Sequence, residues 1–409
     1  MAQGVKLPNT PTCVVEVARP EDVSNVIKII GNTRTPFAIK SGGHASNPGF
    51  SSTPGVFISL VRLNEVTLSS DKSTVEIGTG NVWTDVYAAL DGTDVNVVGG
   101  RVTGPGVGGF SLGGGYSWLI NQYRLTCDNV KALNLILPNG TITYIDSSQS
   151  DLFFALKGGL NRFGVVTSII FNTVPQSNNV YGGIQIYSSE AIPDLIMATY
   201  EFQNEAADPK AQAILTINGG SIPGAVLLLF YDGPESPEAC EPYNSIGGLN
   251  LSTVKSQSYA SFSTGTPSQL QAGHRGAFQS MMTTRELAIL NGGILLSYDL
   301  EPFQRYGEHA TDSAFPHADS PLPLNLYYAW SLESEDAFWR GLIPQSIDHL
   351  TDVAKAKGIG SEPPVYLNYA LDTYSGDQLY GATNAARLLS IQQEYDPNSV
   401  MKLAGGFSF

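Results

Sequence analysis

The sequence predicts an α+β protein of two domains. The chain has 409 residues, 42% of them hydrophobic, which is enough material for two buried cores. In residues 1–175 short strand-like and helix-like runs alternate between glycine breaks. From residue 176 on, longer strand-like runs are separated by helical stretches, a pattern typical of an antiparallel sheet with helices on one side.

The first predicted domain, residues 1–175, begins with a short strand in residues 11–20, which a proline ends. A helix is expected over residues 21–32, where apolar residues recur at helical spacing behind acidic residues. The stretch Leu137-Pro138-Asn139-Gly140 between two apolar runs predicts a hairpin turn. The other predicted elements are strands within residues 35–43, 55–60, 73–80 and 130–145 and a helix within residues 82–92.

The second predicted domain, residues 176–362, has strand-like runs at residues 181–188, 213–220, 225–233, 292–300 and 324–332 and helical stretches at residues 193–206 and 336–358. A C-terminal segment, residues 363–409, is expected to form a strand over residues 365–374 and a helix that ends near Pro397. Pattern alone leaves open which domain this segment packs on.

The composition excludes some partners. Acidic residues outnumber basic ones 37 to 22, for a formal charge of -15, and the sequence contains no cluster of Lys and Arg. Nucleic acids and anionic membranes both need clustered positive charge, so neither is an expected partner. The 3 cysteines are widely spaced without a CxxC pattern, and the histidines lack metal-ligand spacing, so no metal site is expected.

The compartment stays open. The first residues, MAQGVKLPNTPT, have no apolar signal core, and no apolar run is long enough to span a membrane, which predicts a soluble intracellular protein. The sequons at Asn139 and Asn250 leave room for a secreted protein whose signal lies outside this sequence. The oligomeric state is not predicted.

A glycine-rich tract between Gly99 and Leu119 is the densest local signal. Glycines let backbone N–H groups approach a ligand closely, which suits a pyrophosphate or an anionic ring. Two short motifs match formally: the dinucleotide pattern GxGxxG from Gly104 to Gly109, and the hydrolase pattern GxSxG around Ser111. Neither motif has the structural context that its function needs. The glycines that follow GxGxxG predict a poor helix, and Gly104-Pro105-Gly106 stands where the strand before GxSxG should be.

Four ordered motifs carry a resemblance to a known family. They are Ser41-Gly42-Gly43-His44, the glycine tract, Asp128-Asn129-Val130 and the stretch Ala155–Thr167, followed near the C-terminus by Tyr366-Leu367-Asn368-Tyr369 and Tyr395-Asp396-Pro397. The chain resembles the vanillyl-alcohol oxidase superfamily, within it the berberine-bridge-enzyme-like branch and its fungal FAD-linked oxidoreductases. The resemblance implies a two-subdomain FAD-binding domain of the PCMH type and a substrate domain with an antiparallel sheet covered by helices.

The cofactor that the resemblance implies is FAD, joined covalently to His44 through its 8α-methyl group. A neutral imidazole is a good nucleophile, and the flanking glycines leave room for a ring, so the residue chemistry agrees. Val102 replaces the cysteine that makes a second linkage in many relatives, so one bond is expected, and Pro105 occupies the position that influences oxygen access. Cys127 is expected to be a buried structural thiol. The implied cofactor-binding residues are Ser41, Gly42, Gly43, His44, Gly104, Gly106, Val107, Gly108, Gly109, Gly113, Gly114, Asp128, Gly164, Val165, Val166 and Asn368.

Catalysis needs a base beside the flavin, and the resemblance implies Tyr366, Tyr369 or Asp312, with Glu308 as a near alternative to Asp312. Relatives often carry an arginine where this chain has Ala318. Tyr366 and Tyr369 could equally be packing residues without a catalytic role, since tyrosines often fill protein cores. Lys157 and Arg162 are expected either to contact the pyrophosphate or to be solvated.

The predicted function is therefore an FAD-dependent oxidoreductase. Its small-molecule substrate is expected to be an alcohol or a secondary-metabolite intermediate, oxidised by hydride transfer to flavin N5, with O2 as the reoxidant and oxidative cyclisation as a further possibility. A flavin-binding protein without turnover is the alternative, and a hydrolase that uses Ser111 is the third hypothesis.

Overall fold

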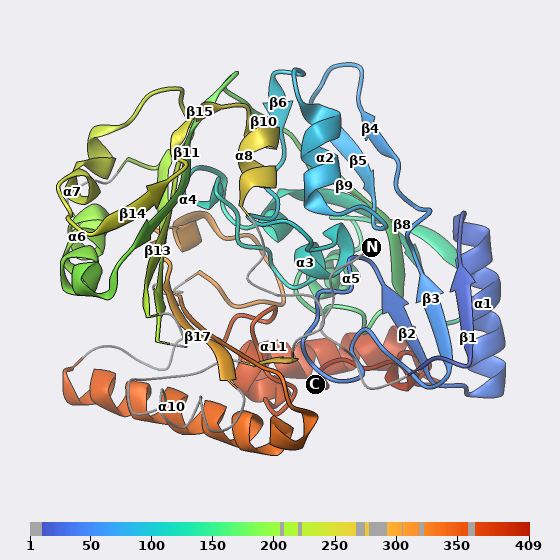
Figure 1. Ribbon diagram of the computed structural model, residues 1–409. Helices are drawn as coiled ribbons and strands as arrows, with labels where there is room; N and C mark the ends of the chain where they lie inside the picture. The colour runs from blue at the N-terminus through green and yellow to red at the C-terminus, as the bar shows by residue number, and fades with distance from the viewer. Residues whose placement is uncertain are drawn as a thin grey trace. The chain divides into compact units, whose positions relative to one another are not determined.

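The computed structural model describes residues 10–204, 208–219, 223–266, 275–277, 293–304, 306–318, 323–358 and 365–409 (Figure 1). The chain divides into two compact units. Unit 1 contains residues 1–176, 306–319 and 364–409, and unit 2 contains residues 177–305 and 320–363. Residues 306–319 therefore belong to unit 1, although they fall inside the predicted second domain.

Unit 1 begins with a parallel three-stranded sheet in the order β1-β3-β2, formed by Cys13–Glu16, Val56–Ser59 and Phe37–Lys40. Helix α1, Pro20–Thr33, starts with a proline, and the Asp22 carboxylate accepts the N–H groups of Ala18 and Arg19 at 3.1 Å. Val23, Ile27 and Ile30 of α1 are buried against this sheet, as the spacing of apolar residues predicts.

A five-stranded antiparallel sheet follows, in the order β4-β5-β9-β7-β8. The hairpin predicted at residues 137–140 is confirmed: the Gly140 N–H donates to the Leu137 carbonyl at 2.8 Å, and Gly140 has φ of 81°. The sequence did not predict β4, which is only three residues long. The strands are β4 Val66–Leu68, β5 Thr74–Gly78, β7 Val130–Ile136, β8 Ile142–Asp146 and β9 Val165–Asn172.

The rest of unit 1 is mostly helical. Helix α11 ends at Tyr395, just before Pro397, as predicted, but the strand predicted over residues 365–374 is wrong. That stretch turns back on itself instead, with the Tyr369 N–H donating to the Tyr366 carbonyl at 2.9 Å. The elements are α2 Trp83–Leu90, β6 Val95–Asn96, α3 Val107–Leu112, α4 Ile120–Tyr123, η1 Thr126–Asn129, α5 Ser150–Leu156, β10 Val174–Pro175, η4 Tyr306–His309, α11 Gly376–Tyr395 and η6 Met401–Leu403.

Unit 2 is built on one eight-stranded sheet, antiparallel throughout, with the path β14-β11-β13-β12-β17-β18-β16 and β15 beside β11. The predicted strand runs all form strands of this sheet. The strands are β11 Val180–Tyr187, β12 Ala211–Asn218, β13 Gly224–Tyr231, β14 Leu249–Ser252, β15 Lys255–Gln257, β16 Arg275–Ala277, β17 Gly293–Leu300 and β18 Leu324–Trp330.

Helices lie on both faces of this sheet, where the sequence predicted one face. Leu195 of α6 packs with Leu215 and Leu227, and Trp339 of α10 stacks on Trp330 at 5.8 Å, so both predicted helices cover the same face. The shorter α8 lies on the other face, where Phe262 contacts Phe230. The helices are η2 Ser189–Ala191, α6 Ile192–Asn204, η3 Glu238–Cys240, α7 Glu241–Asn244, α8 Tyr259–Gly265, η5 Glu333–Glu335 and α10 Asp336–Ala356; α6 and α7 lie side by side (Figure 1).

Among the described helices, none has both the length and the apolar character that crossing a bilayer requires.

Candidate active site

Two glycine-containing loops of unit 1 meet backbone to backbone. The first, Ser41–His44, follows β2, and the second, Gly104–Gly108, leads into α3. A Cβ atom added at Gly42 would collide with the backbone of Gly106, and one added at Gly106 would collide with that of Gly42. Only glycine permits this approach, which brings together two motifs that lie about sixty residues apart.

A chain of hydrogen bonds joins three of the predicted motifs. The Thr79 hydroxyl donates to the Val166 carbonyl at 2.7 Å, the Ser41 hydroxyl donates to the Thr79 carbonyl at 2.5 Å, and the Gly108 N–H donates to the Ser41 Oγ at 3.2 Å. Ser41, Gly108 and Val166 are thus held by Thr79, a buried residue that sequence reasoning missed. Its only sequence signal is its position between Gly78 and Gly80.

The His44 ring lies against Gly104. A Cβ atom at Gly104 would approach the ring Cδ2 to 3.4 Å and Nε2 to 3.5 Å, and the φ of Gly104 is +104°. Burial lowers the pKa of His44 from 6.5 to about 4. The imidazole is therefore neutral near pH 7, the state in which a ring nitrogen can act as a nucleophile.

The position of helix α3 argues against both formal motifs, GxGxxG and GxSxG. The helix opens directly at Val107 but ends at Leu112, and residues 113–117 are not helical, as the three consecutive glycines predict. The nearest preceding strand, β6, ends at Asn96, which is not the strand–loop–helix unit of a dinucleotide site. Ser111 lies within α3, is buried, and donates its hydroxyl to the Val107 carbonyl at 2.7 Å. This placement does not resemble an exposed nucleophile on a strained turn.

The C-terminal motif Tyr366–Tyr369 packs on the end of the glycine tract. A Cβ at Gly113 would collide with the Asn368 amide, and one at Gly114 would lie 3.4 Å from the Tyr366 ring. The Tyr366 hydroxyl oxygen accepts the N–H groups of Gly115 and Tyr116, both at 3.1 Å. Asn368 donates from Nδ2 to the Tyr366 oxygen at 2.9 Å and to the Phe110 carbonyl at 3.1 Å.

Aromatic rings surround this motif. The rings of Tyr116 and Tyr366 stack with centroids 3.7 Å apart, and Tyr369 meets Tyr366 edge to face at 4.7 Å. The hydroxyl of Tyr369 accepts a hydrogen bond from Arg101 Nη2 at 3.0 Å. Tyr366 and Tyr369, the predicted bases, therefore lie together, and Arg101 is a neighbour that sequence reasoning missed because only folding brings it there.

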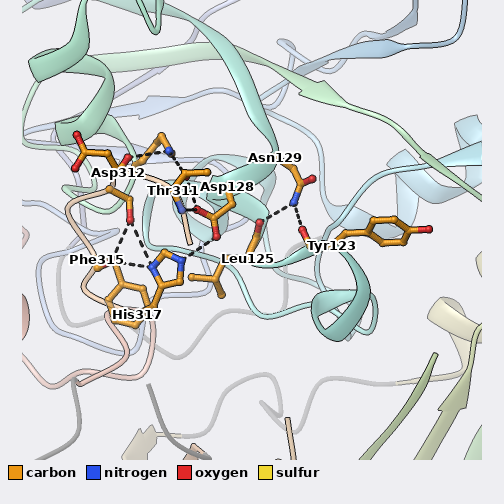
Figure 2. A network of polar contacts seen from close by, with 10 residues as sticks. Tyr123, Leu125, Asp128, Asn129, Thr311, Asp312, Phe315 and His317 are labelled. Atoms are coloured by element: carbon orange, nitrogen blue, oxygen red, sulfur yellow. Dashed lines mark hydrogen bonds and ion pairs between the residues drawn. The ribbon is translucent and has the colours of Figure 1, made fainter. Parts of the chain in front are cut away.

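Asp128 belongs to a buried polar network that holds residues 311–317 on η1 (Figure 2). Its Oδ1 accepts the N–H of Thr311 at 3.0 Å and the Thr311 hydroxyl at 2.5 Å, and its Oδ2 lies 2.8 Å from His317 Nε2. The other ring nitrogen, Nδ1, lies 2.8 Å from the Phe315 carbonyl. Both ring nitrogens of His317 therefore face oxygen atoms, which holds the ring in one orientation.

Burial opposes the charge of Asp128, but the hydrogen bond and charge of His317, with the bonds from Thr311, outweigh it and lower the pKa of the carboxyl. Both carboxylate oxygens are therefore engaged within unit 1. The geometry favours a structural role for Asp128, whereas the resemblance implied a contact with the cofactor.

Asp312 points away from this network toward solvent. Its side chain is 68% exposed and lies 3.1 Å from Arg387, which also pairs with Asp151 at 2.8 Å. A base that abstracts a substrate proton works best when water is excluded from it, so this placement favours a surface ion pair for Asp312. Glu308, the alternative, is also exposed.

Lys157 and Arg162 are buried, so the expectation that they are solvated is wrong, and the alternative contact with the pyrophosphate stays a prediction. Lys157 donates to the Thr311 hydroxyl at 2.5 Å and to the Asp312 carbonyl at 2.9 Å. Arg162 donates to the carbonyls of Met401 at 2.9 Å and Ala404 at 3.1 Å, and also to that of Phe407. Both cations hold returning segments of the chain onto unit 1, because buried charges need such acceptors.

Cys127 is buried, and burial raises the pKa of its thiol well above the ordinary value, in agreement with an inert structural cysteine. Gly164, with φ of +144°, lies so close to the Ile136 carbonyl that a Cβ would collide with it, and Val165 and Val166 are buried in β9. Within the described ranges, His, Cys, Asp and Glu side chains form no group of three or more that could hold a metal.

The residues that meet here fit a flavin. The two loops expose glycine backbone beside a neutral imidazole, and an added Cβ at Gly109 would meet no atom within 4 Å, so space remains on that side of α3. Aromatic rings and an amide lie at the other end of the tract. Such a site suits a flat ring with a phosphate tail.

Comparisons with known proteins agree with this geometry. Residues 11–146 match the FAD binding domain family. The chain is 30% identical to the FAD-dependent monooxygenase tpcD of Cochliobolus heterostrophus, over 95% of this chain and 83% of the relative.

Solved structures share the fold. BBE-like 1 of Physcomitrella patens superposes with a TM-score of 0.76 at 16% identity, covering 98% of this chain and 92% of its own. The 6-hydroxy-D-nicotine oxidase of Arthrobacter nicotinovorans gives 0.78 at 16% identity, covering 100% and 94%. The predicted fold is thus confirmed, and the chain is an FAD-dependent oxidoreductase of the family that includes the fungal FAD-dependent monooxygenase tpcD.

Proposed function

We propose that this enzyme carries FAD in a single covalent linkage to His44. The position of the ring against Gly104 and the neutral state of the imidazole support the linkage. Val102 has no nucleophilic atom, so a second bond at that position is not part of the proposal. Ser41–His44, Gly104–Gly109, Gly113, Gly114 and Asn368 are the proposed cofactor contacts, with Thr79 and Val166 holding the first loop in place.

The proposed reaction is the oxidation of a small alcohol or of a secondary-metabolite intermediate. When bound, FAD supplies the acceptor, at N5, for the hydride that leaves the substrate carbon. Tyr366 or Tyr369 takes the proton of the substrate hydroxyl or amine, so that a carbonyl or imine is formed. O2 is the proposed final oxidant and leaves as hydrogen peroxide after taking up two electrons and two protons. The fungal relative named a monooxygenase supports O2 as the oxidant.

The observation that carries this proposal is the packing of Asn368 and Tyr366 on Gly113–Tyr116. It joins an amide, two phenols and the end of the glycine tract into one site within unit 1. Polar groups that converge beside glycine backbone are typical of a site where a cofactor and a substrate meet. Ring closure coupled to the oxidation is a further reaction that the same site can support, because an oxidised intermediate is electrophilic.

The absorption spectrum of the purified protein tests the cofactor. We expect a yellow protein whose colour stays with the pellet after acid precipitation, whereas the colour of His44→Ala leaves with the supernatant. Colour that leaves both proteins would exclude the covalent linkage. A panel of alcohols and amines then tests turnover by bleaching of the flavin spectrum without O2 and by peroxide formation with O2.

A flavin-binding protein without turnover is the second candidate, and the surface ion pair of Asp312 with Arg387 favours it, because that pair removes one candidate base. The same panel separates the two functions. Bleaching by at least one compound supports the enzyme, and a flavin that sulfite or dithionite bleaches but no compound of the panel does supports the binder.

A further inference from the structure

Arg101 is a buried cation that contacts Tyr369, one of the two candidate bases. Its side chain is 6% exposed, and its guanidinium lies 5.7 Å from the ring centroid of Tyr116 and 5.8 Å from that of Trp118. The Trp118 indole N–H donates to the Arg101 carbonyl at 2.9 Å, so the backbone of Arg101 is held as well. A buried guanidinium keeps its charge, because arginine does not lose its proton in proteins.

The hydroxyl oxygens of Tyr366 and Tyr369 accept hydrogen bonds from different donors. The Tyr366 oxygen accepts from two backbone N–H groups and from the Asn368 amide. Even a phenolate oxygen has only three lone pairs, so these three donors leave the Tyr366 oxygen no site for the substrate's proton. The Tyr369 oxygen accepts a charge-assisted hydrogen bond from Arg101 at 3.0 Å, which favours the phenolate over the phenol.

We propose that Arg101 is a positioning residue that holds Tyr369 as the phenolate which takes the substrate's proton, while Tyr366 serves to hold the glycine tract. This inference rests on the proposed oxidation and names the base that the sequence left open. Among the described residues, the guanidinium of Arg101 and the rings of Tyr116 and Tyr366 lie against Tyr369.

The proton balance of the step is simple. The O–H or N–H bond of the substrate breaks, its proton goes to the Tyr369 oxygen, and the hydride goes to the flavin. Tyr369 becomes a neutral phenol and releases the proton to water before the next turnover. Arg101 keeps its charge and all its protons throughout, so it does not compete for the substrate's proton.

A charge-assisted hydrogen bond changes an equilibrium about 10- to 100-fold, which is about one to two pH units. Replacing Arg101 with methionine keeps most of its volume and removes the charge. The rate of flavin bleaching rises with pH and reaches half its maximum at a midpoint pH. We therefore expect this midpoint to be about one to two units higher in Arg101→Met than in the wild type. Arg101→Lys keeps a charge and is expected to recover most of the shift, whereas the exposed control Arg62→Met leaves the profile unchanged.

An ultraviolet titration tests the same contact without substrate. The tyrosinate absorbance of the flavin-bound protein is followed against pH for the wild type, Tyr369→Phe, Tyr366→Phe and Arg101→Met. We expect a tyrosinate signal about one to two pH units below the ordinary tyrosine pKa of about 10, which Tyr369→Phe abolishes, Arg101→Met moves to higher pH and Tyr366→Phe retains. Identical titrations of the wild type and Arg101→Met would overturn the inference, as would a signal that only Tyr366→Phe abolishes.

The two readouts separate this inference from the proposed function. If no compound is oxidised but the tyrosinate titration behaves as expected, the oxidation fails and the Arg101–Tyr369 contact stands. If a substrate is oxidised and Arg101→Met keeps the wild-type pH profile, the role of Arg101 fails and the oxidation stands. Flavin content and circular dichroism show that each variant is folded, and Arg101→Lys provides the measurement if Arg101→Met does not fold.

Discussion

The imidazole of His317 lies 2.8 Å from the carboxylate of Asp128, and both side chains are almost fully excluded from solvent, at 1% and 0% exposure. The chain leaves unit 2 after β17, contributes residues 306–319 to unit 1, and resumes unit 2 at residue 320, before β18. The contact between Asp128 and His317 therefore joins two parts of unit 1 that lie 189 positions apart in the chain. Phe315, which stacks near His317 at 5.6 Å, in turn contacts Gly114 of the glycine tract.

Breaking this pair should destabilise unit 1 strongly. Asp128→Asn keeps the shape of the side chain but removes the charge of one partner of this buried pair, and removing one partner of a buried pair costs about 3–5 kcal/mol. We expect a loss of this size in the free energy of unfolding, measured in urea by flavin fluorescence. Asp151→Asn is the control, because its contact with Arg387 is exposed and contributes little. Equal, small losses in both variants would contradict the structural role of Asp128.

Covalent attachment of the flavin should tolerate acid. An ordinary histidine takes up a proton as the pH falls through 6.5, but burial lowers the pKa of His44 to about 4, so the nucleophilic neutral ring persists through this interval. Incubating apoprotein with FAD at a series of pH values should give covalent incorporation that falls only as the pH approaches 4. The measurement is acid-precipitated yellow colour. A midpoint near pH 6.5 would show that the ring is not desolvated.

Gly104→Ala should impair the attachment more than it impairs folding. Gly104 and Gly92 both have positive φ, +104° and +75°, so alanine strains the backbone at either position, by about 1–2 kcal/mol. Only at Gly104 does the new methyl group meet the His44 ring; at Gly92 no atom lies within 4 Å. Comparable thermal destabilisation is expected in both variants, with covalent flavin reduced only in Gly104→Ala. Equal flavin content in the two would mean that the ring has room to move.

Tyr366→Phe should act on stability and not on the pH profile. The change removes the acceptor of the Gly115 and Tyr116 N–H groups, and a buried donor left without a partner costs about 1–3 kcal/mol. We expect a lower melting temperature and weaker flavin retention, with the pH profile of flavin bleaching unchanged. Loss of the acidic limb of the profile in Tyr366→Phe would instead identify Tyr366 as the base.

Local pattern predicted most of the secondary structure, because α1, the 137–140 hairpin and the strands of unit 2 each have the periodicity or turn chemistry of their element. It failed where tertiary contacts override propensity. Residues 365–374 alternate in the manner of a strand, but they turn so that Asn368 and Tyr366 can bond to the glycine tract. By contrast, α3 ends before Gly113, as its glycines predict, and Ser41, itself bonded to Thr79, accepts the Gly108 N–H in the first turn of α3.

The sequence by itself indicated the class of the enzyme and the loops of its site, because several ordered motifs together resemble one family and glycines beside a histidine leave room for a ring. The tertiary structure alone decided where the charged and phenolic groups lie. Asp312 faces solvent, Asp128 pairs with His317, and Arg101 reaches Tyr369 across 268 positions of the chain. The charge and hydrogen bonding of such groups depend on burial and on partners distant in sequence, which no local pattern encodes.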